Sequence, residues 1–196
     1  MSDRSFLVLK SRREIRMMRK PGLVVWEAHE RIAETVRPGV TTRELDAIAE
    51  SVFQRHGAEP LFKGYPGDPP FPAVTCISVN DEIVHGIPGD RVLQTGDIVS
   101  IDTGCRIDGW CGDAARTHAV GQIDEQSQLL LDVTRGVLDL AVQLLPQREW
   151  WSEVAEEMES FVNAAGFSMV DQFVGHGIGQ EMHEPPQVPN YWDPEM

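Results

Sequence analysis

The sequence predicts an α+β fold made of two similar halves, each with helices followed by antiparallel strands. Three observations predict it. A strand–turn–strand pattern occupies residues 98–120, helical periodicity lies on both sides of it, and the order of long helix, proline, shorter helix, glycine and strands occurs twice. With 196 residues, 41% of them apolar, the chain is long enough for one domain with a buried core.

Two helices open the first half. The first begins near Ser11, where apolar residues recur at helical spacing. Pro21-Gly22 should kink or interrupt this helix, and Pro38-Gly39 should end it. The sequence Thr-Thr-Arg-Glu at 41–44 is a capping box that should start a second helix, and Gly57 is a typical residue to close it.

A proline- and glycine-rich loop over 58–72 separates these helices from the strands. It carries three aromatic residues, which either line a pocket or anchor the loop to the core: Phe62, Tyr65 and Phe71. A strand should follow over 73–80.

Two aspartates lie in the predicted hairpin over 98–120. Asp108-Gly109 is a preferred two-residue hairpin loop, because both loop positions need a positive φ. With that loop, Asp102 and Asp113 become diagonal neighbours on one face, roughly 7–8 Å apart. Either both are solvated, or a cation or proton holds them together, and a pair of divalent metal ions would suit the geometry. A register slip of one residue would place them on opposite faces.

The second half repeats the helical order. A long helix should begin near residue 124 and end at Pro146, and a shorter helix over 152–165 should end at Gly166. A strand should follow over 170–174. Little strand pattern comes after it, so this half is expected to be incomplete.

Two histidines, His176 and His183, follow that strand. Histidine is the commonest metal ligand and transfers protons near neutral pH. Because the two are seven residues apart, one unbroken strand would place them on opposite faces. Both can serve one site only if the chain turns or bulges near Gly179-Gln180.

Four segments carry a family resemblance: CISVNDEIVHGIPG, GDIVSIDTG, DGWCGDAARTHAVG and VGHGIGQEMHEPPQVPNY. They resemble the type I methionine aminopeptidases, metallopeptidases of the pita-bread fold, and the resemblance extends over nearly the whole chain from about residue 12. It implies two pseudo-symmetric halves around a curved antiparallel sheet. The expected organisation is an N-terminal arm over 1–11 and one domain over 12–196, with a first half at about 12–121 and a C-terminally incomplete second half at about 124–196.

The resemblance implies a set of metal ligands. Asp102, Asp113 and His176 match ligands of the family, in which the residue matching Asp113 bridges two divalent metal ions (Co, Mn, Fe or Zn). The family completes this set with two glutamates on strands beyond the second histidine motif, and this sequence ends at Met196. The expectation is therefore three of five protein ligands, with one retained metal ion as the alternative to two.

The resemblance also implies substrate contacts. His85 matches the histidine that contacts the substrate near its amino-terminal amide, and His183 matches the histidine that hydrogen-bonds the scissile carbonyl oxygen; these two are the expected catalytic side chains. Tyr65 and Cys76 match positions that line the pocket for the methionine side chain. Met182 stands where the family commonly has an aromatic residue, which predicts a softer wall.

The implied function is metal-dependent removal of the N-terminal methionine from nascent proteins and peptides, by a hydroxide that bridges the two metal ions. Two alternatives stay open. One is a catalytically impaired pseudoenzyme that binds peptide N-termini, because two glutamate ligands are absent. The other is a relative of the prolidases and Xaa-Pro aminopeptidases, which share the Asp-Asp-His set.

Charge and cysteine usage restrict the partners and the compartment. With 17 basic and 31 acidic residues the net charge is −14, which disfavours nucleic acid and anionic membranes. The three cysteines form no CxxC motif, so buried thiols in a reducing cytoplasm are expected. No signal peptide or membrane-spanning run is predicted. The expected partner is a peptide or nascent-chain N-terminus near the ribosome, and the oligomeric state stays open.

Overall fold

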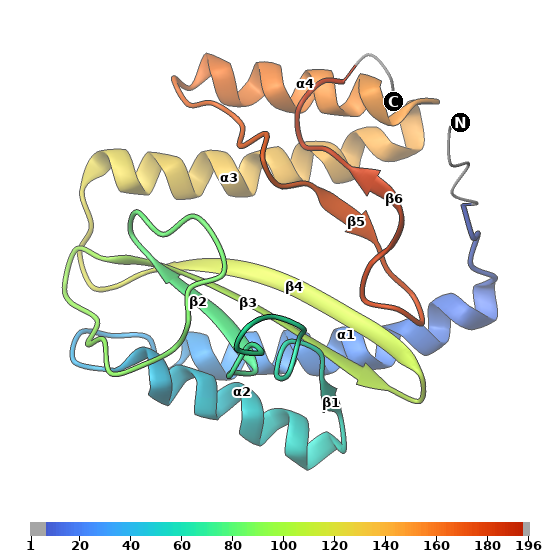
Figure 1. Cartoon of the computed structure of the whole chain (residues 1–196). Helices are drawn as coiled ribbons and strands as arrows, with labels where there is room; N and C mark the ends of the chain where they lie inside the picture. The colour runs from blue at the N-terminus through green and yellow to red at the C-terminus, as the bar shows by residue number, and fades with distance from the viewer. Residues whose placement is uncertain (1–6, 194–196) are drawn as a thin grey trace. The chain divides into compact units, whose positions relative to one another are not determined.

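The computed structural model describes residues 7–193, and these form two compact units. The first, here called the hairpin unit, contains Val8–Asp124 and Ile178–His183; the second unit contains Glu125–Gly177 and the chain from Glu184 onward. Of the arm predicted over 1–11, residues 1–6 lie outside the described part of the chain. Both units combine helices with antiparallel strands (Figure 1), so the α+β class is confirmed.

The central strand of the hairpin unit is β3 (Ile98–Ile107). Along one edge it pairs with β4 (Trp110–Ala119), and along the other it pairs with β2 (Thr75–Val79) and then β1 (Glu59–Pro60), always antiparallel. The loop predicted over 58–72 thus contains a short strand. Its proline is tolerated because an edge strand does not need every N–H for the ladder. Neighbours on both edges hold β3 in place.

The β3–β4 hairpin has the predicted loop. Asp108 and Gly109 are its two loop residues, with φ of 52° and 80°. Asp102 is opposite Ala115, and Asp113 is opposite Gly104. The predicted register is therefore confirmed, and it follows from the loop, because two positive-φ residues match the twist of the flanking strands.

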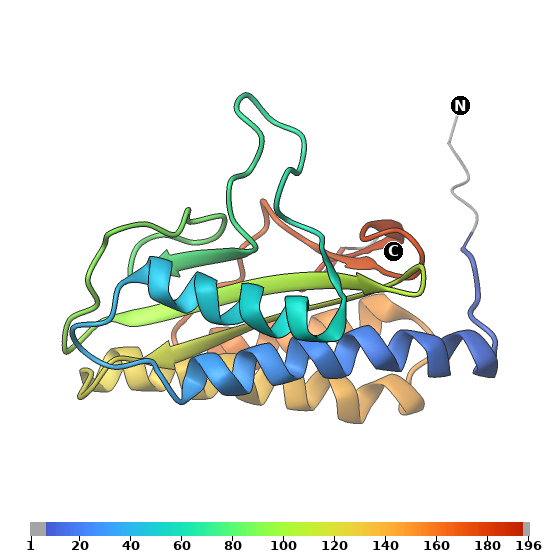
Figure 2. The ribbon, with the colours of Figure 1, turned by 90° about the horizontal axis from the view of Figure 1, so that it is seen from below.

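Two helices, α1 (Arg12–Ala33) and α2 (Thr42–His56), cover one face of this sheet (Figures 1 and 2). Each begins with a capping box, at Ser11 and at Thr41, and Gly57 closes α2 in the left-handed conformation. The start and end predicted for α2 are confirmed. The largest buried side chains of the core between helices and sheet are Phe53, Ile32, Leu45, Ile77, Leu93 and Ile101.

Helix α1 runs without a break through Pro21-Gly22 and ends at Ala33, so the predicted interruption and the predicted end at Pro38 are wrong. The helix packs along β3 and β4, and this packing compensates for the hydrogen bond that proline cannot donate. The approach is closest at Gly112 of β4, where a Cβ would lie 2.6 Å from the backbone nitrogen of Gly22.

The second unit contains a helix pair and a short strand pair. Helix α3 (Glu125–Leu144) packs on α4 (Trp151–Ala164), and β5 (Gly175–Gly177) pairs antiparallel with β6 (Glu184–Val188). A 3₁₀ turn over Leu145–Gln147, with its proline at the start, ends α3 as predicted. The side chains buried between the helices are Val133, Val137, Ala141, Val154, Met158 and Val162.

The strand predicted over 170–174 is wrong. Strand β5 has only three residues, Gly175–Gly177, because β6 offers pairing partners to these alone. A bulge lies between His176 and Gly177, and residues 178–183 are not strand. His176 and His183 therefore do not lie on one unbroken strand, and the bulge is at His176–Gly177 rather than near Gly179-Gln180.

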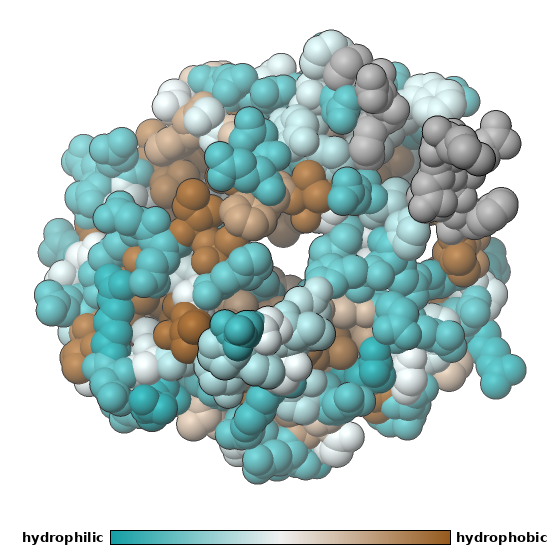
Figure 3. Space-filling model, in the orientation of Figure 1, coloured by the Kyte–Doolittle hydropathy of each residue, from teal (hydrophilic) through white to brown (hydrophobic). Residues whose placement is uncertain are grey.

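The surface seen in Figure 3 is mostly hydrophilic, with exposed apolar side chains scattered over it, in keeping with 31 acidic and 17 basic residues. Helices in the described residues 7–193 lack the apolar length that a bilayer span requires. All three cysteines are free and buried, as expected.

Candidate active site

The two hairpin aspartates lie side by side. Asp102 on β3 and Asp113 on β4 are diagonal neighbours in the register, because Asp102 is opposite Ala115 and Asp113 is opposite Gly104. Burial raises the pKa of Asp113, although the hydrogen bonds from Asp102 and from the Ala114 backbone act in the opposite direction. The pair is therefore a half-buried acidic site in which like charges must be neutralised by a proton or a cation.

A divalent metal ion fits this pair chemically. Carboxylate oxygens are the ligands that hard and borderline divalent cations take in proteins. Space around the carboxylates is kept by Gly104, where a Cβ would lie 3.3 Å from Asp113 Oδ1 and 3.1 Å from the Gly112 carbonyl oxygen. Within residues 7–193, however, no three His, Cys, Asp or Glu side chains are gathered closely enough to hold a metal ion.

His176 has the hydrogen bonding of a metal-binding histidine. It lies on β5 in the second unit, with Nδ1 2.9 Å from the Gly177 carbonyl oxygen. Because a carbonyl only accepts, Nδ1 is the donor in this contact, and Nε2 is the ring nitrogen left to face a metal ion. A backbone partner of this kind fixes the tautomer of metal-ligating histidines. Strand β6 approaches β5 closely, since a Cβ on Gly177 would lie 2.5 Å from the Pro185 carbonyl oxygen.

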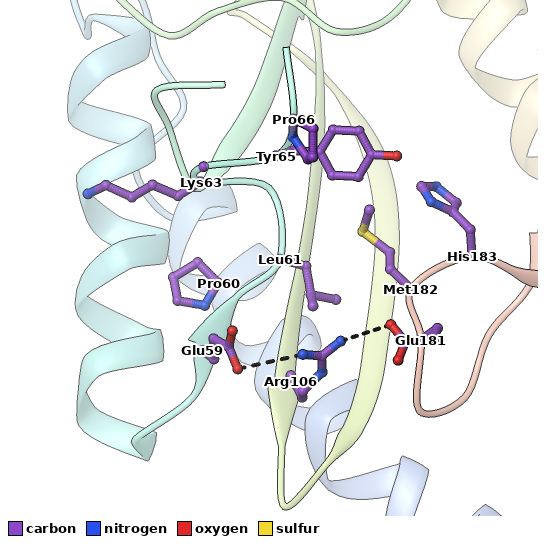
Figure 4. Close-up of a pocket in the computed structure, with 11 residues that line it drawn as sticks. Glu59, Pro60, Leu61, Lys63, Tyr65, Pro66, Arg106, Glu181, Met182 and His183 are labelled. Carbon is purple, nitrogen blue, oxygen red and sulfur yellow. Dashed lines mark hydrogen bonds and ion pairs between the residues drawn. The ribbon is translucent and has the colours of Figure 1, made fainter. Parts of the chain in front are cut away.

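A cavity of about 430 Å³ lies in the hairpin unit (Figure 4). Its walls come from two segments far apart in sequence, 59–66 and 181–183, with Arg106 of β3 between them. Tyr65 and His183 face each other edge to face, with ring centroids 6.0 Å apart and planes at 83°. The structure thus brings together two of the predicted substrate residues, together with Met182.

Two other predicted substrate residues do not line this cavity. Cys76 lies on β2 directly opposite Asp102, and burial, together with the charges of Asp102 and Asp113, raises its pKa to about 12. Its thiol therefore stays protonated at neutral pH. His85 is exposed, with φ of 61°, on the turn before Gly86. Gly86 anchors that turn to β2, because its carbonyl accepts from the Ile77 N–H at 2.8 Å.

The charged end of the cavity is not predicted by any sequence motif described above. Arg106 lies there between Glu59 at 3.8 Å and Glu181 at 3.4 Å. Its place depends on the pairing of β1 with β3, which no local pattern indicated. The alternation of β3 could have signalled it, since Arg106 is a charged residue in an otherwise apolar part of that strand.

Comparison with known proteins agrees with this architecture. The description "Metallopeptidase family M24" matches residues 16–196. Methionine aminopeptidase 1 of Bacillus subtilis is 43% identical over 188 residues, which are 96% of this chain and 75% of that protein. A methionine aminopeptidase of Clostridium perfringens is 45% identical over 188 residues, covering 96% of this chain and 74% of its own length.

Solved structures show the same fold. The methionine aminopeptidase of Thermotoga maritima superposes with a TM-score of 0.90 at 36% identity, over 97% of this chain and 76% of that one. The prolidase of Pyrococcus furiosus superposes with a TM-score of 0.77 at 23% identity, over 94% and 53% of the two chains, and shows the fold alone. Both the family match and the identity to curated relatives are high, so the chain has the pita-bread fold and belongs to metallopeptidase family M24 and, within it, to the methionine aminopeptidase family.

Proposed function

We propose that this chain removes the N-terminal methionine from peptides and newly made proteins, in a reaction that depends on divalent metal ions. The observation that carries the proposal is the adjacent pair Asp102 and Asp113, in a chain 43% identical to a methionine aminopeptidase. Two carboxylates held next to each other in a half-buried site attract a cation strongly. The family itself is metal-dependent.

Asp102, Asp113 and His176 are the metal ligands in this proposal. His176 would hold an ion through Nε2, and Asp113 would be shared if two ions were bound. Co, Mn, Fe and Zn are the candidates, and one retained ion is the alternative. When bound, a divalent ion supplies a Lewis acid and an acidified water at neutral pH. The two aspartate side chains would hold the ion beside β3. Pairing with β2 on one edge and with β4 on the other keeps this strand in place.

The cavity supports a role in holding the first side chain of the substrate. Tyr65 and Met182 supply an aromatic and a flexible apolar wall, which suits methionine. His183 projects into the same cavity, and we assign it the hydrogen bond to the scissile carbonyl, where negative charge develops in the transition state. His85 is assigned to substrate beyond the first side chain, and Cys76 to packing beside Asp102.

The proposed substrate is the N-terminus of a peptide or nascent chain, met in the cytoplasm close to the ribosome. Nucleic acid and membrane are not proposed as partners, because the net charge is −14.

Release of methionine from a Met-Ala-Ser peptide tests the proposal. The purified chain is stripped with a chelator and reloaded with Mn, Co, Fe(II) or Zn, and free methionine is measured. We expect no release without metal and release with at least one of these ions, while Xaa-Pro peptides stay intact. Turnover of the Xaa-Pro peptides would favour the prolidase alternative. Absence of methionine release with all four ions would contradict the proposed activity.

Asp113→Ala should lower kcat/KM for this peptide by at least about 100-fold, because loss even of a residue that merely supports a metal ligand costs 10–100-fold. Asp108→Asn is the matched control, since Asp108 is exposed at the loop of the same hairpin, and it should leave kcat/KM unchanged. A mild effect of Asp113→Ala would overturn the ligand role. Calorimetric titration of metal into both variants counts the sites that depend on Asp113.

A second candidate is binding of peptide N-termini without hydrolysis. It is favoured by the observation that the described residues gather no group of three metal-ligating side chains. Calorimetry with Met-Ala-Ser would then show binding, and the assay above would show no release.

A further inference from the structure

We propose that Arg106 and Cys111, opposite each other across the β3–β4 hairpin, are positioning residues that hold the Gly179–His183 segment and thereby set the width of the cavity. The positioning itself stands on contacts within the hairpin unit. Its consequence for substrate choice rests on the function proposed above.

Cys111 fixes the start of the segment. Its backbone N–H donates to the Gly179 carbonyl at 2.7 Å, and its thiol donates to the Gln180 carbonyl at 3.4 Å. The Gly179 N–H then donates to the Glu181 carbonyl at 3.1 Å, which closes a tight turn. Cys111 is only 1% exposed, so both of its bonds start from a buried residue. The segment is thus tied through backbone atoms to β4.

Arg106 fixes the end of the segment. Its guanidinium lies 3.4 Å from the Glu181 carboxylate and 3.8 Å from the Glu59 carboxylate. Figure 4 shows Arg106 between the two acidic residues, which belong to opposite walls of the cavity. One planar, multidentate side chain therefore sets the separation of the walls, a role that a lysine ammonium fills poorly.

The position of Glu181 also sets the positions of the two residues that follow it, Met182 and His183. Met182 and His183 line the cavity opposite Tyr65, and the 6.0 Å ring separation depends on where the segment is held. Release of Glu181 would let Met182 move away from Tyr65 and widen the space. A wider cavity should distinguish less well between methionine and branched or bulkier first residues. Even in a well-formed apolar pocket, one methylene changes the binding free energy only modestly.

Hydrogen exchange tests the positioning without any assay of activity. In Arg106→Met, the amides of Cys111 and Gly179 should exchange about two- to fivefold faster, the range expected for one partly exposed ion pair. Arg106→Lys should fall between wild type and Arg106→Met. Lys20→Met is the matched control, because Lys20 of α1 pairs at 2.7 Å with Asp108, which lies at the loop of the same hairpin. Equal exchange in Arg106→Met and wild type would overturn the proposal.

Two further variants separate the individual contacts. Glu181→Gln should reproduce Arg106→Met, and the double variant should exchange no faster than either single variant, because both remove one interaction. Additive effects would mean that Arg106 does not act through Glu181. Cys111→Ala should speed exchange at Gly179, whereas Cys111→Ser keeps a donor for the Gln180 carbonyl and should not. Equal exchange rates at Gly179 in the two variants would show that the thiol does not help to hold the segment.

Substrate choice is measured as the ratio of kcat/KM for Met-Ala-Ser over Leu-Ala-Ser. Arg106→Met should lower this ratio about threefold, mainly through a higher KM for the methionine peptide, and calorimetric metal affinity should stay unchanged. An unchanged ratio with faster exchange would leave the positioning in place and overturn its role in specificity. If wild type releases no methionine, the proposed function fails, and the exchange result still decides the positioning.

Discussion

Single residues decide how closely helix α1 approaches the sheet. Gly112 lies against Pro21-Gly22, and the Cys105 thiol donates to the Pro21 carbonyl at 3.7 Å. Gly112 is also next to Asp113, so the same contact that seats the helix fixes the strand beside the carboxylate. The close approach could not be predicted, because nothing local distinguishes a glycine pressed against a helix from a glycine in a loose strand.

Gly112→Ala should therefore destabilise the chain by about 2 kcal/mol or more, since the new Cβ would lie 2.6–2.8 Å from backbone atoms that cannot turn aside. Gly22→Ala is the matched control from the other side of the contact. Its Cβ meets nothing within 4 Å, and alanine in a helix is worth about 1 kcal/mol over glycine. Urea unfolding followed by circular dichroism measures both. A neutral Gly112→Ala would contradict the close packing.

Among the secondary-structure elements, the register of the β3–β4 hairpin could be predicted from the sequence, whereas the pairing of β3 with β1 could not. The positions of Asp102 and Asp113 follow from a two-residue loop, which is local information. The pairing of β1 with β3, and so the place of Arg106, depends on a loop more than 30 residues away in sequence. The strand predicted at 170–174 fails for a related reason: its apolar residues resemble a strand, but no strand within residues 7–193 pairs with them.

The loop gives a prediction about the hairpin as an element. Asp108 has φ of 52°, a conformation that asparagine and aspartate tolerate and alanine does not. Asp108→Ala should cost about 1 kcal/mol of unfolding free energy, and Asp108→Asn only a few tenths, although both remove the exposed pair with Lys20. Comparison of the two variants by urea unfolding isolates the backbone contribution. Equal losses would assign the effect to the ion pair instead.

For the whole molecule, one buried histidine links stability to pH. His29 of α1 is 1% exposed, and its Nε2 donates to the Ala114 carbonyl at 2.9 Å. Burial lowers its pKa below the ordinary value of 6.5, although the bond to Ala114 acts the other way. The unfolded chain thus binds the proton more readily than the folded chain. His29 contributes full stability above pH 6.5, and the contribution is lost as pH falls below that value.

The unfolding free energy should therefore decrease below pH 6.5, with a slope from this residue of at most about 1.4 kcal/mol per pH unit. His29→Gln keeps an N–H donor but cannot be protonated, so its curve should be flatter between pH 6.5 and 5 than that of wild type. The two proteins are compared at pH 8, where both side chains are neutral, to set the baseline. Parallel curves would show that His29 does not titrate on unfolding.

The hairpin should form quickly compared with the synthesis of the rest of the chain. Asp102 and Asp113 are separated by a short stretch of sequence, and a hairpin of this kind closes in about 1–10 μs. Ribosomes add only about 5–20 residues per second. We therefore expect the acidic pair to be assembled once residue 120 has left the ribosome, seconds before the later residues are available. Under the proposed function, a cation present at that moment would meet both carboxylates while the chain is still being made.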